Sequence, residues 1–236
     1  MSFLAINICL VSTAFDSAVL PLSGSLCPAA DDSSTWDSDV AYQLIHLSEK
    51  KPKKGYGHAH CTLVQLCART TELNELKEEV RRVCAEHRPE QDGEKLSMER
   101  VCGGPIFGKL PDDTEIYLPY VRVERSEPLY NLHSALVNAV RRFAVAVKST
   151  DVAKSSFHKH FPTDGTTSID WMLKYIDEHS YSNYNPHITL GASPMCLEKL
   201  AFLQRTEVPW RRCRVVVSHM GNYCSCFEIL DQSNHK

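Results

Sequence analysis

Residues 60–63 read His-Cys-Thr-Leu and residues 187–190 read His-Ile-Thr-Leu, and the pattern His-x-Thr occurs nowhere else in the chain. Each copy lies in an apolar run that is typical of a strand. After each copy the sequence has the pattern of a capped amphipathic helix and then of two further strands. Two copies of one supersecondary unit predict a duplicated, bilobal α+β fold.

The spacing within each copy places its polar side chains on one side of the strand. Residues two apart in a strand point to the same face, so His60 and Thr62 are expected to project together. The same holds for His187 and Thr189, while the apolar residues between them pack inward. We therefore expect two antiparallel sheets with outer helices around a central cleft, related by a pseudo-twofold axis, with two imidazoles and two hydroxyls in the cleft.

Two imidazoles and two hydroxyls suit phosphodiester chemistry without a metal. A neutral imidazole can take a proton from water while a protonated one donates to the leaving oxygen, because the ordinary pKa of histidine lies near the working pH. Threonine hydroxyls can hold the non-bridging phosphate oxygens as those gain charge. We therefore predict His60 and His187 as catalytic residues, with Thr62 and Thr189 binding substrate.

Residues that flank the motifs are further candidates for substrate binding. His58 lies two residues before His60 and is expected to share its face, where it could contact phosphate; a strand-end position near solvent is the alternative. Tyr56 and Tyr184 could stack on a base, although tyrosines beside strands also commonly cover the edge of a core. Arg122 could offset phosphate charge or simply face solvent.

The two motifs, in HAHCTLVQL (residues 58–66) and YNPHITLGAS (residues 184–193), resemble the two signatures of the two-histidine (2H) phosphoesterase superfamily. This superfamily includes LigT-like RNA 2′-5′ ligases and the 2′,3′-cyclic nucleotide phosphodiesterases. The resemblance covers about residues 56–231, including the helix expected at 130–136. It implies a bilobal fold with a central cleft and a metal-independent reaction on cyclic phosphates or 2′-5′ linkages.

Matched position by position, the resemblance implies that His60 and His187 form the acid/base pair and that Thr62 and Thr189 are phosphate ligands. It implies no cofactor and no metal. The chain departs from the family pattern in an acidic, Ser- and Asp-rich insertion at residues 16–40 and in a long gap between the motifs. These departures leave the subfamily open, and a 3′-5′ RNA exonuclease-type phosphodiesterase is one alternative.

Composition and charge restrict the partners that fit. The chain has 236 residues, of which 43% are hydrophobic and 23% charged, as expected for one globular domain of two lobes over residues 1–236. Its 26 basic and 29 acidic residues give a net charge of −3, which argues against a broad basic face for duplex nucleic acid. Residues 1–49 contain no Lys or Arg, so the remainder is mildly basic and suits an anionic ligand. We expect a nucleotide or short RNA as partner and a monomeric protein.

Cysteine usage and the apolar start of the chain bear on its location. The 10 cysteines include no Cys-x-x-Cys pair, so we interpret them as mostly reduced, semi-buried thiols. Residues 3–10 are too short for a membrane-spanning helix and lack the positive start of a signal peptide. We therefore expect no membrane association, and a cytoplasmic or nuclear protein.

Two hypotheses of another class compete with the hydrolase. A nucleotide-binding module of the same fold would need no acid/base pair, so the intact motifs argue against it. A zinc protein could use His58, His60 and His187, but neither motif supplies a carboxylate or paired thiols at metal spacing.

The remaining pattern predicts the elements between and around the motifs. Thr71 is expected to cap a helix that ends near His87, and residues 16–40 and 149–168 are expected to be loops. The other expected helices begin at Pro128, at Ile169 and at Pro194, the last capped by Ser193. The expected strands cover 3–11, 58–65, 99–110, 114–124, 186–190, 212–219 and 223–231.

Overall fold

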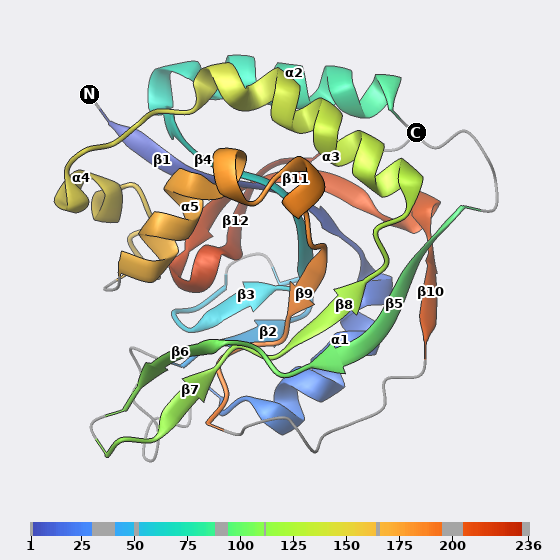
Figure 1. The fold of residues 1–236 in the computed structure, drawn as a ribbon, viewed down its shortest axis with the longest axis vertical. Helices are drawn as coiled ribbons and strands as arrows, with labels where there is room; N and C mark the ends of the chain where they lie inside the picture. Colours follow the sequence, from blue (N-terminus) through green and yellow to red (C-terminus); the bar gives the residue numbers. More distant parts are fainter. Residues whose placement is uncertain are drawn as a thin grey trace.

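The structure is a computed structural model that describes residues 2–29, 41–49, 52–87, 94–110, 112–163, 166–194 and 205–232. It has an α+β fold, as the sequence predicts, with two largely antiparallel sheets, a short hairpin and helices on the outside (Figure 1). No helix among these residues is both long enough and apolar enough to cross a membrane.

The larger sheet has six strands in the order β2-β3-β12-β11-β1-β4, and the smaller sheet has four in the order β10-β5-β8-β9. All neighbours are antiparallel except β2 and β3. The strands of the larger sheet are β1 (Phe3–Val11), β2 (Gln43–Ile45), β3 (Tyr56–His58), β4 (His60–Arg69), β11 (Arg214–Gly221) and β12 (Ser225–Gln232). Those of the smaller sheet are β5 (Lys95–Cys102), β8 (Tyr120–Val123), β9 (His187–Thr189) and β10 (Thr206–Pro209), and the separate hairpin is β6 (Ile106–Lys109) and β7 (Glu115–Tyr117).

The two sheets contain matching three-stranded units, β11-β1-β4 and β5-β8-β9. In each unit the motif strand, β4 or β9, is the outer strand, and it pairs with a strand that precedes it in the chain. After β4 the chain crosses to the smaller sheet as β5, and after β9 and β10 it returns to the larger sheet as β11. The repeat therefore begins one strand before each motif, and each half contributes strands to both sheets.

Helices α2 and α3 lie side by side across one face of the larger sheet (Figure 1). Leu76 and Val80 of α2 and Leu132 and Leu136 of α3 are buried in one core with Leu63 of β4. Burial of each such side chain contributes about 1.5–3 kcal/mol. The helices are α1 (Thr13–Leu26), α2 (Leu73–Glu86), α3 (Glu127–Val140), α4 (Thr150–Ser155) and α5 (Thr166–Glu178).

The prediction of a loop at residues 16–40 is wrong for residues 16–26, because these residues belong to α1, which ends at Leu26. Ser12 caps this helix by accepting a hydrogen bond from the amide of Ala14, and Phe15 and Val19 are buried one turn apart. Its serines, aspartate and Pro21 give a composition typical of a loop, which hides the helical spacing of the apolar side chains. Residues 30–40 of the predicted loop lie outside the described part of the chain.

The loop predicted at residues 149–168 is also partly helical. Ser149 accepts a hydrogen bond from the amide of Val152 and starts the short helix α4, whose Ala153 is buried. Helix α5 begins at Thr166, three residues before the predicted start. A short polar helix with one buried position carries too little periodicity to be detected from sequence.

The two long strands predicted at 99–110 and 114–124 are each interrupted. The first becomes β5 and β6 on either side of Pro105, and the second becomes β7 and β8 on either side of Pro119. Proline lacks the backbone N–H that a continuous ladder requires, so each strand breaks there.

The start of α2 and the presence of β10 also differ from the prediction. A 3-10 turn over Thr70–Glu72 precedes α2, so Thr71 is not its cap. The predicted hairpin around Gly221 is present as β11 and β12, while β10 was not predicted. Most of the helix predicted after Ser193 lies outside the described residues.

Candidate active site

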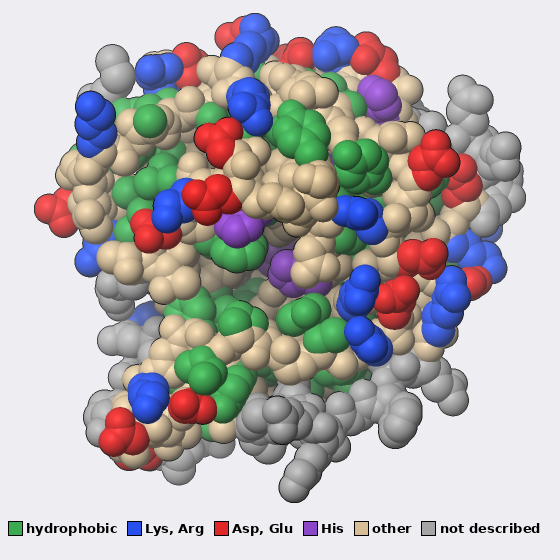
Figure 2. Space-filling model, viewed as in Figure 1, with side chains coloured by type: hydrophobic (Ala, Val, Ile, Leu, Met, Phe, Trp, Pro, Cys, Tyr) green, Lys and Arg blue, Asp and Glu red, His purple; other side chains and the backbone are tan. Residues whose placement is uncertain are grey.

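The two motif strands come together where the two sheets meet. The hydroxyl of Tyr184 donates a hydrogen bond of 3.0 Å to the carbonyl of Thr62, which ties the segment before β9 to β4. Residues of β4, which carries His60, also contact residues of β9, which carries His187. Figure 2 shows histidine side chains in a hollow near the centre of the visible face of the molecule, in the region where Figure 1 draws β9.

Both motif histidines make the same hydrogen bond to the backbone. Nδ1 of His60 donates to the carbonyl of His58, and Nδ1 of His187 donates to the carbonyl of Asn185, each at 2.8 Å. A carbonyl only accepts, so Nδ1 carries the proton in each ring. In a neutral imidazole this leaves the lone pair on Nε2, and both rings therefore present a proton acceptor at the same atom.

Burial keeps both imidazoles neutral near pH 7. It lowers the pKa of His60 to about 4, and the nearby His187 and His58 add to that lowering, while the hydrogen bond to the His58 carbonyl opposes it. Burial also lowers the pKa of His187, against the opposing effect of the Asn185 carbonyl. An anion bound between the rings would favour a protonated imidazole, since opposite charge raises the pKa of histidine.

The side chains of Thr62 and Thr189 are half-buried, as is His187, whereas His60 is buried. The hydroxyl of Thr62 accepts long hydrogen bonds of 3.5 Å from the side-chain amides of Asn7 and Gln65. Both amide oxygens are buried without a hydrogen-bond partner. Neither Asn7 nor Gln65 was predicted: the pairing of β1 with β4 brings Asn7 to Thr62, and Gln65 follows Thr62 on β4 beyond the irregularity at which the register shifts between Ile8 and Cys9.

A glycine fixes the chain directly after the second motif. Gly191 has a φ of 136°, a conformation that favours glycine, and a Cβ there would collide with the carbonyl of Tyr42. The buried hydroxyl of Ser23 in α1 donates to the carbonyl of Leu190 at 2.6 Å and accepts from the amide of Leu44 at 2.9 Å. Helix α1 and β2 therefore hold the end of β9 in place.

The smaller sheet adds positive charge beside the second motif. Arg122 lies directly opposite His187 in the β8–β9 pair, and Arg100 lies opposite Arg122 in the β5–β8 pair. Residues directly opposite in an antiparallel pair share a face, so both exposed arginines lie on the face of His187. Arg122 also forms an ion pair of 3.2 Å with Glu99. Basic side chains gather beside the hollow, over β5 and β8 (Figure 2).

An aromatic ring lies on the same face. Tyr120 is opposite Thr189 in the ladder, and its half-buried ring makes an edge contact with the imidazole of His187 at 5.2 Å between centroids. This side chain was not singled out from the sequence, where it lies far from either motif.

His58 and His60 belong to different strands, whereas one continuous strand was expected. The strand is interrupted at Ala59, so His58 belongs to β3 and pairs with Cys226 of β12, whereas His60 begins β4 and pairs with Val11. The His58 ring lines a separate pocket of about 780 Å³, and burial lowers its pKa to about 4. The alternation that predicts a shared face holds only within a continuous strand.

The tyrosines predicted to bind a base are both buried. The Tyr184 ring stacks on His133 at 3.8 Å between centroids with planes 2° apart, and the side chain is 3% exposed. His133 is itself held by the carbonyl of Leu63 and the amide of Tyr181. Tyr56 is 8% exposed in β3. Tyr184 therefore uses its ring and its hydroxyl to connect the motif strands to the core.

The zinc site considered for His58, His60 and His187 is not present in the described part of the chain. There, the side chains close enough to share a metal ion are His158, His219 and Glu228. The described cysteines are free thiols, all of them buried except the half-buried Cys102.

Comparison with known proteins adds little to the site. No protein-family model matches this chain, and no curated protein matches it. A solved structure described as that of a phosphoesterase aligns over 97% of this chain and 96% of its own, with 11% sequence identity and a TM-score of 0.42. A TM-score of that size does not establish a shared fold.

Proposed function

We propose that this protein is a metal-independent phosphodiesterase that acts on 2′,3′-cyclic nucleotides, on cyclic RNA termini or on 2′-5′ linked oligonucleotides. The observation that carries this proposal is the matched pair of hydrogen bonds from Nδ1 of His60 and His187 to the carbonyl two residues earlier. Two neutral imidazoles with the same free atom, on neighbouring motif strands, form an acid/base pair once one of them gains a proton.

The reaction follows from that arrangement. Nε2 of one histidine takes a proton from water as the water oxygen attacks phosphorus. Nε2 of the other, protonated when the anionic substrate binds, donates its proton to the leaving ribose oxygen as the phosphorus–oxygen bond breaks. After the reaction the first histidine carries the proton and the second is neutral. A cyclic substrate yields a nucleoside monophosphate.

The surrounding residues would stabilise the charge that develops on phosphorus. The hydroxyls of Thr62 and Thr189 donate to the non-bridging oxygens, and Asn7 and Gln65 orient the first of these hydroxyls. Arg100 and Arg122 would supply positive charge beside His187, and the net charge of −3 suits one or a few nucleotides rather than a duplex. The protein would act as a monomer on this substrate.

A turnover assay tests the proposal. Purified protein with a chelator is incubated with 2′,3′-cyclic nucleotides and, separately, with 2′-5′ oligoadenylate, beside His60→Ala and His187→Ala. His87→Ala, at the exposed end of α2, is the matched control. Hydrolysis that survives the chelator, persists in the control and is lost in both motif variants is the expected result.

The other outcomes point to the competing functions. Equal activity in the wild type and both motif variants would show that the site is assigned wrongly. Tight nucleotide binding without turnover would favour a binding module, and cleavage restricted to linear 3′-5′ RNA would favour an exonuclease-type enzyme.

A further inference from the structure

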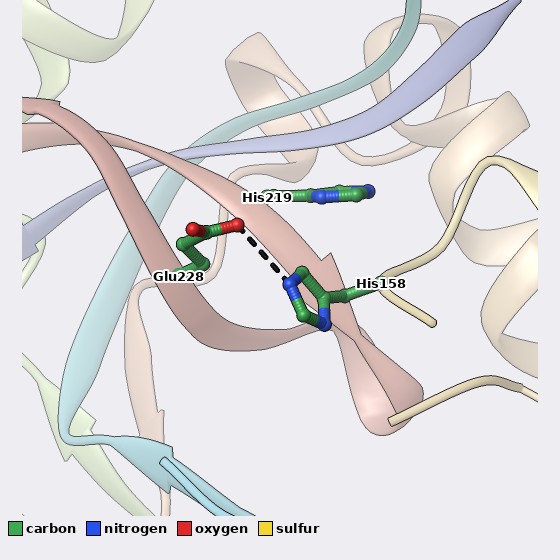
Figure 3. Close-up of side chains that lie close together, drawn as sticks. All are labelled: His158, His219 and Glu228. Carbon is green, nitrogen blue, oxygen red and sulfur yellow. Dashed lines mark hydrogen bonds and ion pairs between the residues drawn. The ribbon is translucent and has the colours of Figure 1, made fainter. Parts of the chain in front are cut away.

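A second group of chemically active side chains lies apart from the motif histidines. His158 follows α4, His219 is on β11 and Glu228 is on β12, and their ligand atoms lie within 4.8 Å of one another. Nε2 of His158 is 3.1 Å from a carboxylate oxygen of Glu228, and the rings of His158 and His219 meet edge to face at 5.0 Å (Figure 3).

We propose that His158, His219 and Glu228 form a binding site for a divalent transition metal, with Zn²⁺ as the best match. Two imidazoles and one carboxylate are a common zinc donor set that leaves a fourth position for water. Zinc bonds to nitrogen and oxygen of about 2.0–2.2 Å at tetrahedral angles place neighbouring ligand atoms about 3.3 Å apart. The nitrogen–oxygen distance of 3.1 Å between His158 and Glu228 is already close to that spacing.

The orientation of His219 fits a metal ligand. Its Nε2 donates a hydrogen bond of 2.8 Å to the carbonyl of Ser156, so the neutral ring has its lone pair on Nδ1. Metal-bound histidines characteristically donate their other N–H to a carbonyl or carboxylate, which fixes the ring and its tautomer. The backbone therefore prepares His219 to bind a cation through Nδ1.

His158 must change its tautomer to bind. Its Nδ1 accepts a hydrogen bond of 3.2 Å from the amide of His160, so Nε2 carries the proton and donates it to Glu228. When a metal binds at Nε2, this proton moves to Nδ1 and the bond from the His160 amide is given up. The metal then takes the place of the proton between His158 and Glu228.

The site is accessible and is separate from the motif histidines. His158 and Glu228 line the pocket of about 780 Å³ that also contains His58 and His160, and neither His60 nor His187 lines it. The side chain of Glu228 is 54% exposed, which gives a metal ion a path from solvent. A bound metal would connect the segment after α4 to two strands of the larger sheet, and so would stabilise this part of the fold.

Metal binding by the folded protein tests this inference. Chelator-treated full-length protein is titrated with Zn²⁺ by equilibrium dialysis, beside His219→Ala and Glu228→Gln. The matched controls are His87→Ala and Glu178→Gln, two exposed helix-end positions. We expect one Zn²⁺ per wild-type and control chain, an affinity at least about tenfold lower in both site variants, and a rise in thermal midpoint with Zn²⁺ only in wild type and controls.

Each other outcome would overturn the proposal. No saturable uptake of Zn²⁺ by the wild type would show that the group is not a metal site. Equal affinity in Glu228→Gln would do the same, and this variant replaces an exposed side chain, so its fold is expected to be retained. Loss of uptake in His60→Ala or His187→Ala, with retention in His219→Ala, would place the metal at the motif histidines instead.

Discussion

Strands β4 and β9 carry the same motif and the same backbone hydrogen bond, but their neighbours differ. On the larger sheet, His60 lies opposite Val11 and is 6% exposed. On the smaller sheet, half-buried His187 lies opposite the exposed Arg122. The hydrogen bond from Nδ1 to the backbone carbonyl sets the same tautomer in both histidines. The residue opposite each histidine differs, and with it the exposure of the ring and the charge beside it. The two motifs thus share one hydrogen-bond geometry but differ in the charge beside each histidine.

Removal of either imidazole is expected to have the largest effect, because the pair can work only if both halves take part. His60→Ala and His187→Ala should each lower kcat by about 10³-fold, within the usual range for a general acid or base. Steady-state kinetics on a 2′,3′-cyclic nucleotide measures the change, with His87→Ala as reference. A loss confined to one variant would mean that the two halves are not chemically equivalent.

The stability of the fold in acid should depend on the burial of His60. The pKa of His60 is about 4 in the folded chain and near 6.5 when unfolded, so the unfolded state binds the extra proton between these values. The free energy of unfolding is therefore fully retained above pH 6.5 and falls toward pH 4, by about 1.4 kcal/mol per pH unit from this group.

Denaturant titrations from pH 7 to pH 4 measure that slope. His60→Gln should flatten it relative to the wild type, and His87→Gln should leave it unchanged. An unaltered slope in His60→Gln would contradict the burial of a neutral imidazole at this position.

The threonines test whether the two hydroxyls are equivalent. Thr62→Val and Thr189→Val keep the side-chain shape and remove one donor each, so each should lower kcat/KM by about 10²-fold. The loss in Thr62→Val should also appear when Asn7 is changed to Ala, because Asn7 contacts that hydroxyl and not Thr189. Equal effects of Asn7→Ala in the wild type and in the Thr62→Val background would show that the two side chains act independently.

The smallest effect is expected from the positive charge that Arg122 of the smaller sheet places beside His187. Arg122→Gln should raise KM about fivefold with little change in kcat, and the difference should shrink at high salt because exposed charges are screened. Arg82→Gln, on the exposed face of α2, is the control. A KM that is independent of salt in both proteins would show that Arg122 does not attract the substrate.

The sequence predicts the parts of the site that depend on spacing within one strand or helix. Helical spacing correctly predicts the buried side of α2. His60 and Thr62 lie in a regular part of β4, opposite Val11 and Cys9, and their joint role in a site stays a prediction. The expected alternation fails where a strand is interrupted: Ala59 separates β3 from β4, so His58 faces a different pocket.

Other features depend on pairing between distant strands, which no local pattern encodes. Asn7 reaches Thr62 only through the register of β1 with β4, and Arg100 reaches the face of His187 only through two successive pairings in the smaller sheet. The His158, His219 and Glu228 group likewise joins the segment after α4 to the β11–β12 hairpin, in which His219 lies opposite Glu228.

The crossing of the chain between sheets has a consequence for how such a protein can be divided. A cut between β7 and β8, where the second copy of the repeat begins, would leave β1 to β7 in one fragment and β8 to β12 in the other. Each fragment would then hold an incomplete portion of both sheets, as in a dimer formed by exchange of strands. Neither half of the repeat can therefore complete either sheet without the other, so the two halves are expected to fold as one cooperative unit.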